Sequence, residues 1–268
     1  MTEKTRVCLV GATGWTGRAL VAALRDSDAF QVTGAVARRS AGQDLGLATG
    51  GSAWGVSVSA TVQEALGAGA QVLIDYSHPT AVKDHVLTAL RQGVAVVVGT
   101  SGLSPADFQE IRDLAETRAL GVIAAGNFSI TAALAKHLSL IAARFLPHRE
   151  ILDYAQADKP DVPSGTTQEL AEGLAQVRKN DLLKPIEELL GPREARGASV
   201  AGTQVHSVRL PGYTLAFETL FGLPDERLTI RHDAGSGAGP YVAGTLLAAE
   251  RVLKVRGLIR GLDQLLFA

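Results

Sequence analysis

At 268 residues, the chain is long enough for one large domain or for two modest domains with a substantial core. Its content of 46% apolar and 20% charged residues is usual for a soluble globular protein, and a net charge of −1 argues against a basic face for nucleic acid. The single cysteine excludes an intramolecular disulfide, and no apolar run reaches the roughly 18 residues of a membrane span. We therefore expect a cytoplasmic protein that binds neither nucleic acid nor membranes.

The first predicted strand leads into a glycine-rich turn. Residues 6–10 form a mostly apolar run, followed by G-A-T-G-W-T-G at 11–17 and by a helical pattern through Leu20, Val21 and Leu24. Strand, glycine turn and helix in this order form the context of a dinucleotide fingerprint, in which the glycines allow a tight turn and close approach to a pyrophosphate. The spacing G-x-x-G-x-x-G is a variant of the usual pattern.

The second predicted strand, at 31–37, ends in Arg38 and Arg39. At this distance from the glycine turn, an acidic residue would bind the ribose 2′-hydroxyl of NAD, whereas arginine suits the 2′-phosphate of NADP. The sequence therefore predicts NADPH over NADH, with NADH still possible. The structural alternative is a solvated loop pair.

Strands and helices then alternate with short connections. The predicted strands are 72–76, 94–98 and 121–125, and the predicted helices are 80–91 and 104–118. This pattern predicts an α/β fold with a Rossmann-like, doubly wound parallel sheet. The loops 77–79, 99–102 and 126–129 follow strand carboxyl ends, where such sheets bind ligands.

After Phe128 the pattern changes to one long helix at 130–146 and then to strands at 150–154, 203–209, 213–221 and 227–232. Runs of strands after a β-α-β half indicate a separate α+β domain. We expect the dinucleotide-binding domain to comprise 1–127 and 241–268, with a helix at 240–253 that packs back on it. Residues 128–240 would then form a mixed-sheet domain for substrate binding and oligomerisation.

The stretch K-P-D-V-P-S-G-T at 159–166 precedes a helical pattern that starts at Thr167. Ser164 and Thr166 are natural N-cap residues, and Glu169 completes a capping-box pattern with Thr166. The start of this helix would offer backbone N–H groups to an anion, with Lys159 just upstream. A well-capped helix after a rigid turn is the structural alternative.

Together these motifs resemble those of the 4-hydroxy-tetrahydrodipicolinate reductase (dihydrodipicolinate reductase) family. The residues that carry the resemblance are the glycine turn at 11–17, the runs 75–79, 99–102 and 127–129, the motif 159–166, and the runs 206–209 and 226–232. The resemblance implies NAD(P)H-dependent hydride transfer to a cyclic imine or enamine carboxylic acid in lysine and diaminopimelate biosynthesis. It also implies a homotetramer built by the mixed-sheet domain.

The resemblance assigns roles position by position. The pyrophosphate and the adjoining ribose would contact Gly11, Ala12, Thr13, Gly14, Trp15 and Thr16. Arg39 would bind the 2′-phosphate, and Arg38 stands where many members have an acidic residue. The nicotinamide site would comprise Gly99, Thr100, Ser101, Ala125, Gly126, Asn127 and Phe128. The substrate carboxylate would be held by Ser164, Gly165 and Thr166, with Lys159 as the catalytic lysine.

Two departures from the family pattern fall on the substrate side. Ala155 and Gln156 stand where the family has a His-His pair, and residues 234–239 lack an arginine that members commonly have. Alanine cannot donate a proton, and glutamine does not exchange protons at neutral pH. The remaining candidate donors are Tyr154, Asp158, Lys159 and His206. Two alternatives therefore stay open: an imine reductase or amino-acid dehydrogenase with another substrate, and a non-catalytic NADP-binding sensor.

Overall fold

The computed structural model describes residues 3–267, and the chain divides into two compact units. Of the described residues, 3–130 and Ala238–Leu266 form unit 1, and Thr131–Gly237 with Phe267 form unit 2. The expected domain limits were 127 and 241, so each observed boundary lies three residues away, at 130 and 238. Each unit has its own sheet and its own buried core.

Unit 1 is built on a seven-stranded sheet in which every neighbouring pair is parallel. In sheet order, the strands are β12 (Gly257–Arg260), β6 (Gly121–Ala124), β5 (Ala95–Val98), β4 (Val72–Asp75), β1 (Thr5–Val10), β2 (Phe30–Val36) and β3 (Val58–Ser59). All residues of β4, β5 and β6 are buried, as expected for apolar runs covered on both faces.

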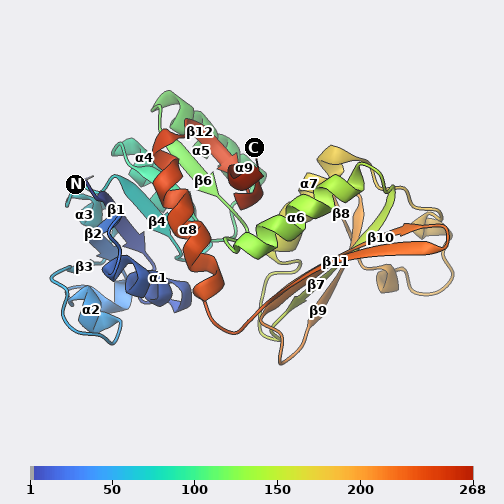
Figure 1. Cartoon of the computed structure of the whole chain (residues 1–268), viewed down its shortest axis with the longest axis horizontal. Coiled ribbons are helices and arrows are strands. Elements are labelled where there is room, and N and C mark those ends of the chain that lie inside the picture. The colour runs from blue at the N-terminus through green and yellow to red at the C-terminus, as the bar shows by residue number, and fades with distance from the viewer. Residues whose placement is uncertain (1–2, 268) are drawn as a thin grey trace. The chain divides into compact units, whose positions relative to one another are not determined.

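Helices cover both faces of this sheet, which confirms the doubly wound fold (Figure 1). On one face, α1 (Trp15–Arg25) contacts α8 (Gly239–Arg251), so the helix after unit 2 does return to unit 1. On the other face, α3 (Val62–Leu66), α4 (Val82–Arg91) and α5 (Pro105–Thr117) form a row. The remaining elements of unit 1 are the short α2 (Leu45–Ala48) and α9 (Leu262–Phe267) and the 3₁₀ turns η1 (Arg38–Ser40) and η4 (Val252–Lys254).

The strand order reverses between β1 and β4, which lie side by side with Val10 paired to Asp75. The chain runs from β1 outward through β2 and β3, and then from β4 outward in the opposite direction through β5, β6 and β12. In parallel sheets of this kind, ligands bind beyond the carboxyl ends of the strands at such a reversal. The glycine turn, the 77–79 loop and the 99–102 loop all leave strands at this edge.

Unit 2 is an α+β unit with a five-stranded mixed sheet. In sheet order, the strands are β11 (Glu226–Ala234), β10 (Leu215–Leu223), β7 (His148–Ala155), β9 (Thr203–Arg209) and β8 (Ala198–Val200), and only the β7–β9 pair is parallel. Helices α6 (Ile130–Ala143) and α7 (Gly165–Val177) pack on one face, where Ile151, Phe217 and Phe221 meet Leu170 and Leu174. Residues 178–198 contain the 3₁₀ turns η2 (Ile186–Glu188) and η3 (Arg193–Arg196).

Several short elements were not expected from the sequence: α2, α3, β3, β8, β12 and α9. Strand β12 is the most consequential, because its four residues add a seventh strand beside β6. Short elements give too few residues for a periodic pattern, and their pairing partners are distant in the sequence. Within the described residues 3–267, no helix is long and apolar enough to cross a membrane.

Candidate active site

The glycine turn has strict steric requirements. Gly11 has φ +79°, and a Cβ there would lie 2.1 Å from the carbonyl oxygen of Tyr76 at the end of β4. A Cβ at Gly17 would lie 2.1 Å from the carbonyl oxygen of Gly11. Gly11 is therefore required by the turn and by its approach to β4, whereas Gly17 is required for α1 to pack against the turn.

The N-terminus of α1 is suited to an anion. Gly14 is its N-cap, makes no side-chain cap hydrogen bond, and the first turn contains no acidic residue. The N–H groups of a first helical turn lack intrahelical acceptors, and the helix dipole adds positive potential there. Ala12 is fully buried and its amide donates to the Val36 carbonyl at 3.3 Å, so it shapes the turn, whereas Trp15 is 53% exposed. This cradle fits the pyrophosphate of a dinucleotide.

Arg38 and Arg39 lie in η1, directly after β2, and both are exposed. Among residues 3–267, neither guanidinium forms an ion pair. Both are thus placed at the carboxyl edge of the sheet with their charges unneutralised.

Tyr76 separates the glycine turn from the 99–102 loop. A Cβ at Gly99 would lie 2.3 Å from the Tyr76 ring, so the second loop also needs glycine at its first position. The Tyr76 hydroxyl is 2.7 Å from Thr245 Oγ1 on α8, and burial raises the pKa of Tyr76, which keeps the phenol protonated. Thr100 Oγ1 donates to Asp75 Oδ1 at 2.6 Å.

The remaining predicted nicotinamide residues differ in accessibility. Ser101 and Gly126 are exposed, and Ala125 is buried at the end of β6. Asn127 Oδ1 accepts from the Ser129 amide at 2.8 Å, which shapes the loop. Phe128 is 1% exposed, and its ring packs edge-on against Tyr76, with centroids 6.2 Å apart. Phe128 is therefore part of the core of unit 1.

In unit 2, Ser164 is the N-cap of α7, with its Oγ 3.4 Å from the Thr167 amide. The predicted capping box of Thr166 and Glu169 is wrong, because the helix already begins at Gly165. Glu169 instead pairs with Lys136 on α6 at 2.6 Å. The sequence offered two hydroxyls in cap positions, and the tertiary contacts of Ser164 selected the earlier one.

Those contacts centre on Asp153, a fully buried carboxylate on β7. It accepts from Ser164 Oγ (2.6 Å), the Ser164 amide (3.0 Å), Thr167 Oγ1 (3.0 Å) and Ser207 Oγ (3.1 Å), and it pairs with Arg209 Nη2 (2.8 Å). Burial alone would raise the pKa of Asp153, but the hydrogen bonds from Ser164 and the ion pair with Arg209 outweigh it and lower the pKa. The Ser164 hydroxyl proton is thus committed to Asp153.

Lys159 and the rest of its loop are anchored to the same network. Lys159 Nζ lies 2.6 Å from Asp161 Oδ1, and its side chain is 30% exposed. Arg209 Nη2 also donates to the Asp161 carbonyl at 2.8 Å. Asp153 and Arg209 therefore fix the 159–166 motif at two points: Arg209 at Asp161 and Asp153 at Ser164.

Asp153 and Arg209 are the residues that sequence reasoning missed. Alternation on β7 places Asp153 on the same face as Ile151 and Ala155, so an acid at a core position was the available signal. Arg209 lies in the 206–209 run but carried no assigned role. Their contact spans 56 residues of sequence, which no local pattern reveals.

The other candidate proton donors are engaged elsewhere. Tyr154 donates to Glu218 Oε1 at 3.1 Å, and His206 Nε2 lies 2.7 Å from Glu150 Oε2. The strand register places Tyr154 and His206 on the sheet face opposite Asp153. Asp158 is exposed in the loop beside Lys159. Of the four candidates, Lys159 and Asp158 belong to the loop that Asp153 and Arg209 anchor.

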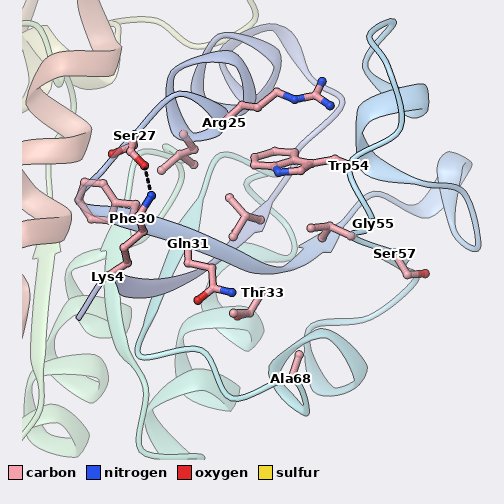
Figure 2. A pocket seen from close by; sticks show the side chains of 13 residues that line it. Lys4, Arg25, Ser27, Phe30, Gln31, Thr33, Trp54, Gly55, Ser57 and Ala68 are labelled. Carbon is pink, nitrogen blue, oxygen red and sulfur yellow. Dashed lines mark hydrogen bonds between the residues drawn. The ribbon is translucent and has the colours of Figure 1, made fainter. Parts of the chain in front are cut away.

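A cavity of about 600 Å³ in unit 1 lies away from these residues. The start of β2 lines it. Arg25 lies over the Trp54 ring on one side of the cavity, and Gln31 and Thr33 lie on the other (Figure 2). It adjoins the C-terminal end of α1, whereas the anion-binding end is at Trp15. The cavity is therefore separate from the cofactor edge. No cluster of three or more metal-ligating side chains occurs among the described residues.

The chain combines a Rossmann-type parallel sheet with a second, α+β unit. In the first unit, the N-terminus of α1 is suited to an anion at the point where the strand order reverses. These features define a two-domain dinucleotide-binding protein. Comparison with known proteins gives the family. The family model "Dihydrodipicolinate reductase, N-terminus" matches residues 5–128, and "Dihydrodipicolinate reductase, C-terminus" matches residues 127–266. The chain belongs to the dihydrodipicolinate reductase family, which confirms the resemblance drawn from its motifs.

Individual relatives agree over the full length. The chain is 37% identical over 272 residues to 4-hydroxy-tetrahydrodipicolinate reductase of Thermosynechococcus vestitus, covering 99% of this chain and 98% of that one. It is 37% identical over 267 residues to the enzyme of the same name from Moorella thermoacetica, covering 99% of both. Dipicolinate-bound dihydrodipicolinate reductase from Paenisporosarcina sp. TG-14 superposes with a TM-score of 0.79 at 29% identity, covering 98% and 99%.

Proposed function

We propose that this chain is a 4-hydroxy-tetrahydrodipicolinate reductase of lysine and diaminopimelate biosynthesis that uses NADPH. The observation that carries the proposal is the full-length match to reductases of that name, with the 159–166 motif present and anchored as described. The test is NADPH oxidation with freshly generated 4-hydroxy-tetrahydrodipicolinate, followed by loss of near-ultraviolet absorbance. Turnover at about 1–10³ s⁻¹ supports the proposal. Binding of NADPH without turnover refutes it.

The residues of the 159–166 motif in unit 2 have different roles toward the substrate. The Gly165 and Thr166 amides at the start of α7 hold a carboxylate, assisted by the helix dipole. Lys159 either donates a proton or binds a carboxylate, and its ion pair with Asp161 keeps the ammonium in place. Ser164 acts by fixing the first turn of α7, since its hydroxyl proton goes to Asp153. Bound NADPH supplies the hydride, and the added proton completes reduction of the C=N or C=C bond.

NADPH is preferred because Arg38 and Arg39 place two positive charges after β2 and no acidic side chain stands there. The comparison is the KM for NADPH against the KM for NADH in the native chain and in Arg39→Ala. The KM for NADPH should rise about tenfold or more in the variant, while the KM for NADH stays within about twofold. A native preference for NADH overturns this cofactor choice.

A reductase or dehydrogenase of another imino or keto acid is the second candidate. It is favoured by Ala155, which is fully buried at the end of β7, where the family has the first histidine of its pair. Tyr154 and His206 do not replace that histidine, because they lie on the opposite sheet face. If 4-hydroxy-tetrahydrodipicolinate fails, other cyclic imino acids and keto acids with ammonia are the substrates to assay. NADPH binding that no carboxylate ligand perturbs would instead favour a sensor.

We also propose a cytoplasmic homotetramer, with a mass near four times 28.0 kDa by light scattering. Unit 2 exposes Leu183, Leu190 and Leu228, the first two at 89% and 101%. Strands β9 and β10 are both interior strands of the unit 2 sheet, with neighbours on each side. They can therefore meet a second copy through a sheet face and not by edge pairing.

A further inference from the structure

Asp75 is a second fully buried carboxylate, and it lies at the carboxyl end of β4, where the strand order of unit 1 reverses. Its Oδ1 accepts from the Ser77 amide (2.9 Å), Ser77 Oγ (2.7 Å) and Thr100 Oγ1 (2.6 Å). Its Oδ2 is 2.8 Å from His85 Nδ1.

These hydrogen bonds join three segments of unit 1. Ser77 belongs to the loop between β4 and α4, Thr100 to the loop between β5 and α5, and His85 to α4. The Ser77 amide also donates to Thr100 Oγ1 at 2.8 Å, and the Gly99 amide donates to the Asp75 carbonyl at 2.9 Å. The two loops are therefore tied to each other as well as to Asp75.

The trio of Ser77, His85 and Asp75 is not a nucleophilic triad. Ser77 Oγ donates to Asp75 directly, and both Ser77 and Asp75 contact the same imidazole nitrogen, Nδ1 of His85. In a triad, the nucleophile and the carboxylate bind opposite nitrogens of the imidazole. The hydroxyl here is held by the acid, and no base is positioned to activate it.

We propose that Asp75 is a positioning residue that fixes the 77–79 and 99–102 loops against each other, so that Thr100 and Ser101 present their backbone to the nicotinamide half of the cofactor. The inference rests on the proposed cofactor site. A carboxylate suits this position because it accepts from all four surrounding donors without offering one of its own. His85 holds the second oxygen and thereby sets the rotation of the carboxylate.

The test is the Kd for NADPH, measured by the fluorescence of the bound cofactor, in Asp75→Ala, Asp75→Asn, Thr100→Val and the double variant Asp75→Ala/Thr100→Val. Asparagine keeps one acceptor oxygen for Ser77 and Thr100, and its amide nitrogen can take the place of Oδ2 beside His85 Nδ1. Asp75→Ala should raise the Kd about tenfold or more, whereas Asp75→Asn should raise it less than about threefold. The double variant should bind no more weakly than Asp75→Ala, because both changes remove the same connection.

Ile111→Ala is the matched control. Ile111 is fully buried on α5 in the core of the same unit, so its truncation destabilises unit 1 without removing a loop hydrogen bond. Its Kd for NADPH should stay within about twofold of the native value at a temperature where both proteins are folded. A loss of affinity in Ile111→Ala as large as that in Asp75→Ala would overturn the positioning role and indicate a general effect of stability.

The remaining outcomes also decide the question. An Asp75→Ala chain that folds and binds NADPH like the native chain overturns the inference. If Asp75→Ala does not fold, the test compares the Kd for NADPH of Asp75→Asn with that of Thr100→Val. An equal, tenfold rise in Kd in both variants would show that asparagine does not replace the aspartate and would overturn the inference. Native NADPH binding without substrate turnover refutes the proposed reductase but leaves this comparison valid. Failure of the native chain to bind NADPH or NADH refutes both.

Discussion

Two serines donate to the same buried carboxylate, and only one of them also caps a helix. Ser164 Oγ donates to Asp153 Oδ1 at 2.6 Å and accepts from the Thr167 amide, whereas Ser207 Oγ donates to Asp153 Oδ2 at 3.1 Å. Replacing each serine by alanine therefore removes a hydrogen bond to the same charge. Only Ser164→Ala removes the N-cap of α7 as well.

The expected losses of stability follow from these contacts. A hydrogen bond to a charged group contributes about 1.5–3 kcal/mol, and the longer bond of Ser207 belongs at the low end of that range. The N-cap adds about 0.5–1 kcal/mol, because its 3.4 Å contact to the Thr167 amide is long. We expect Ser164→Ala to lower the free energy of unfolding by about 2–4 kcal/mol and Ser207→Ala by about 1.5 kcal/mol.

The measurement is urea unfolding followed by two probes. Both tryptophans, Trp15 and Trp54, lie in unit 1, so their fluorescence reports on that unit, whereas far-ultraviolet circular dichroism reports on both. The variants should shift the transition seen by circular dichroism more than the one seen by fluorescence wherever the two units unfold separately. The KM for the carboxylate substrate is measured in parallel in Ser164→Ala.

Equal losses in the two variants, or a loss below about 0.5 kcal/mol in Ser164→Ala, would refute the assignment of the Ser164 hydroxyl to Asp153. A tenfold rise in KM without any loss of stability would instead show that this hydroxyl contacts the substrate directly. Because the two serines donate to the two oxygens of one carboxylate, their effects should not be additive in the double variant.

Gly11→Ala should abolish NADPH binding, because its Cβ would clash with the Tyr76 carbonyl. Gly93 has the same φ of +79° but lies in open space, so Gly93→Ala should retain NADPH binding. Normal NADPH binding by Gly11→Ala would contradict the steric argument. Lys159→Ala should lower kcat by about 10²–10⁴-fold with the Kd for NADPH within about twofold, and an unchanged kcat would exclude it from catalysis. The pKa of Asp153 lies below its ordinary 3.8, so its carboxylate stabilises the fold above that pH and loses this effect as the pH falls through the folded-state pKa. Asp153→Asn should therefore be less stable than the native chain at pH 7, with the difference in unfolding free energy shrinking in acid; a constant difference would contradict this linkage.

Local sequence patterns were sufficient to predict the order of the main strands and helices. The apolar run at 6–10, its glycine turn and the following helical period predicted β1 and α1 because each signal lies within a few residues of the next. The same holds for the alternation through β6 and for the change of pattern after Phe128. The motif at 159–166 marked the start of α7, and together with the other motifs it was sufficient to indicate the family.

Tertiary contacts decided which atoms of those motifs are already engaged in hydrogen bonds within the fold and which can bind a ligand. Ser164 rather than Thr166 caps α7 because Asp153 lies opposite it on β7, and Lys159 pairs with Asp161, whose carbonyl accepts a hydrogen bond from Arg209. Strand β12 exists because β6 offers it a partner. A sequence determines the order of helices, strands and turns through interactions over a few residues. The hydrogen bonds of a buried carboxylate depend on which distant segments the fold brings beside it, and only the tertiary structure supplies that information.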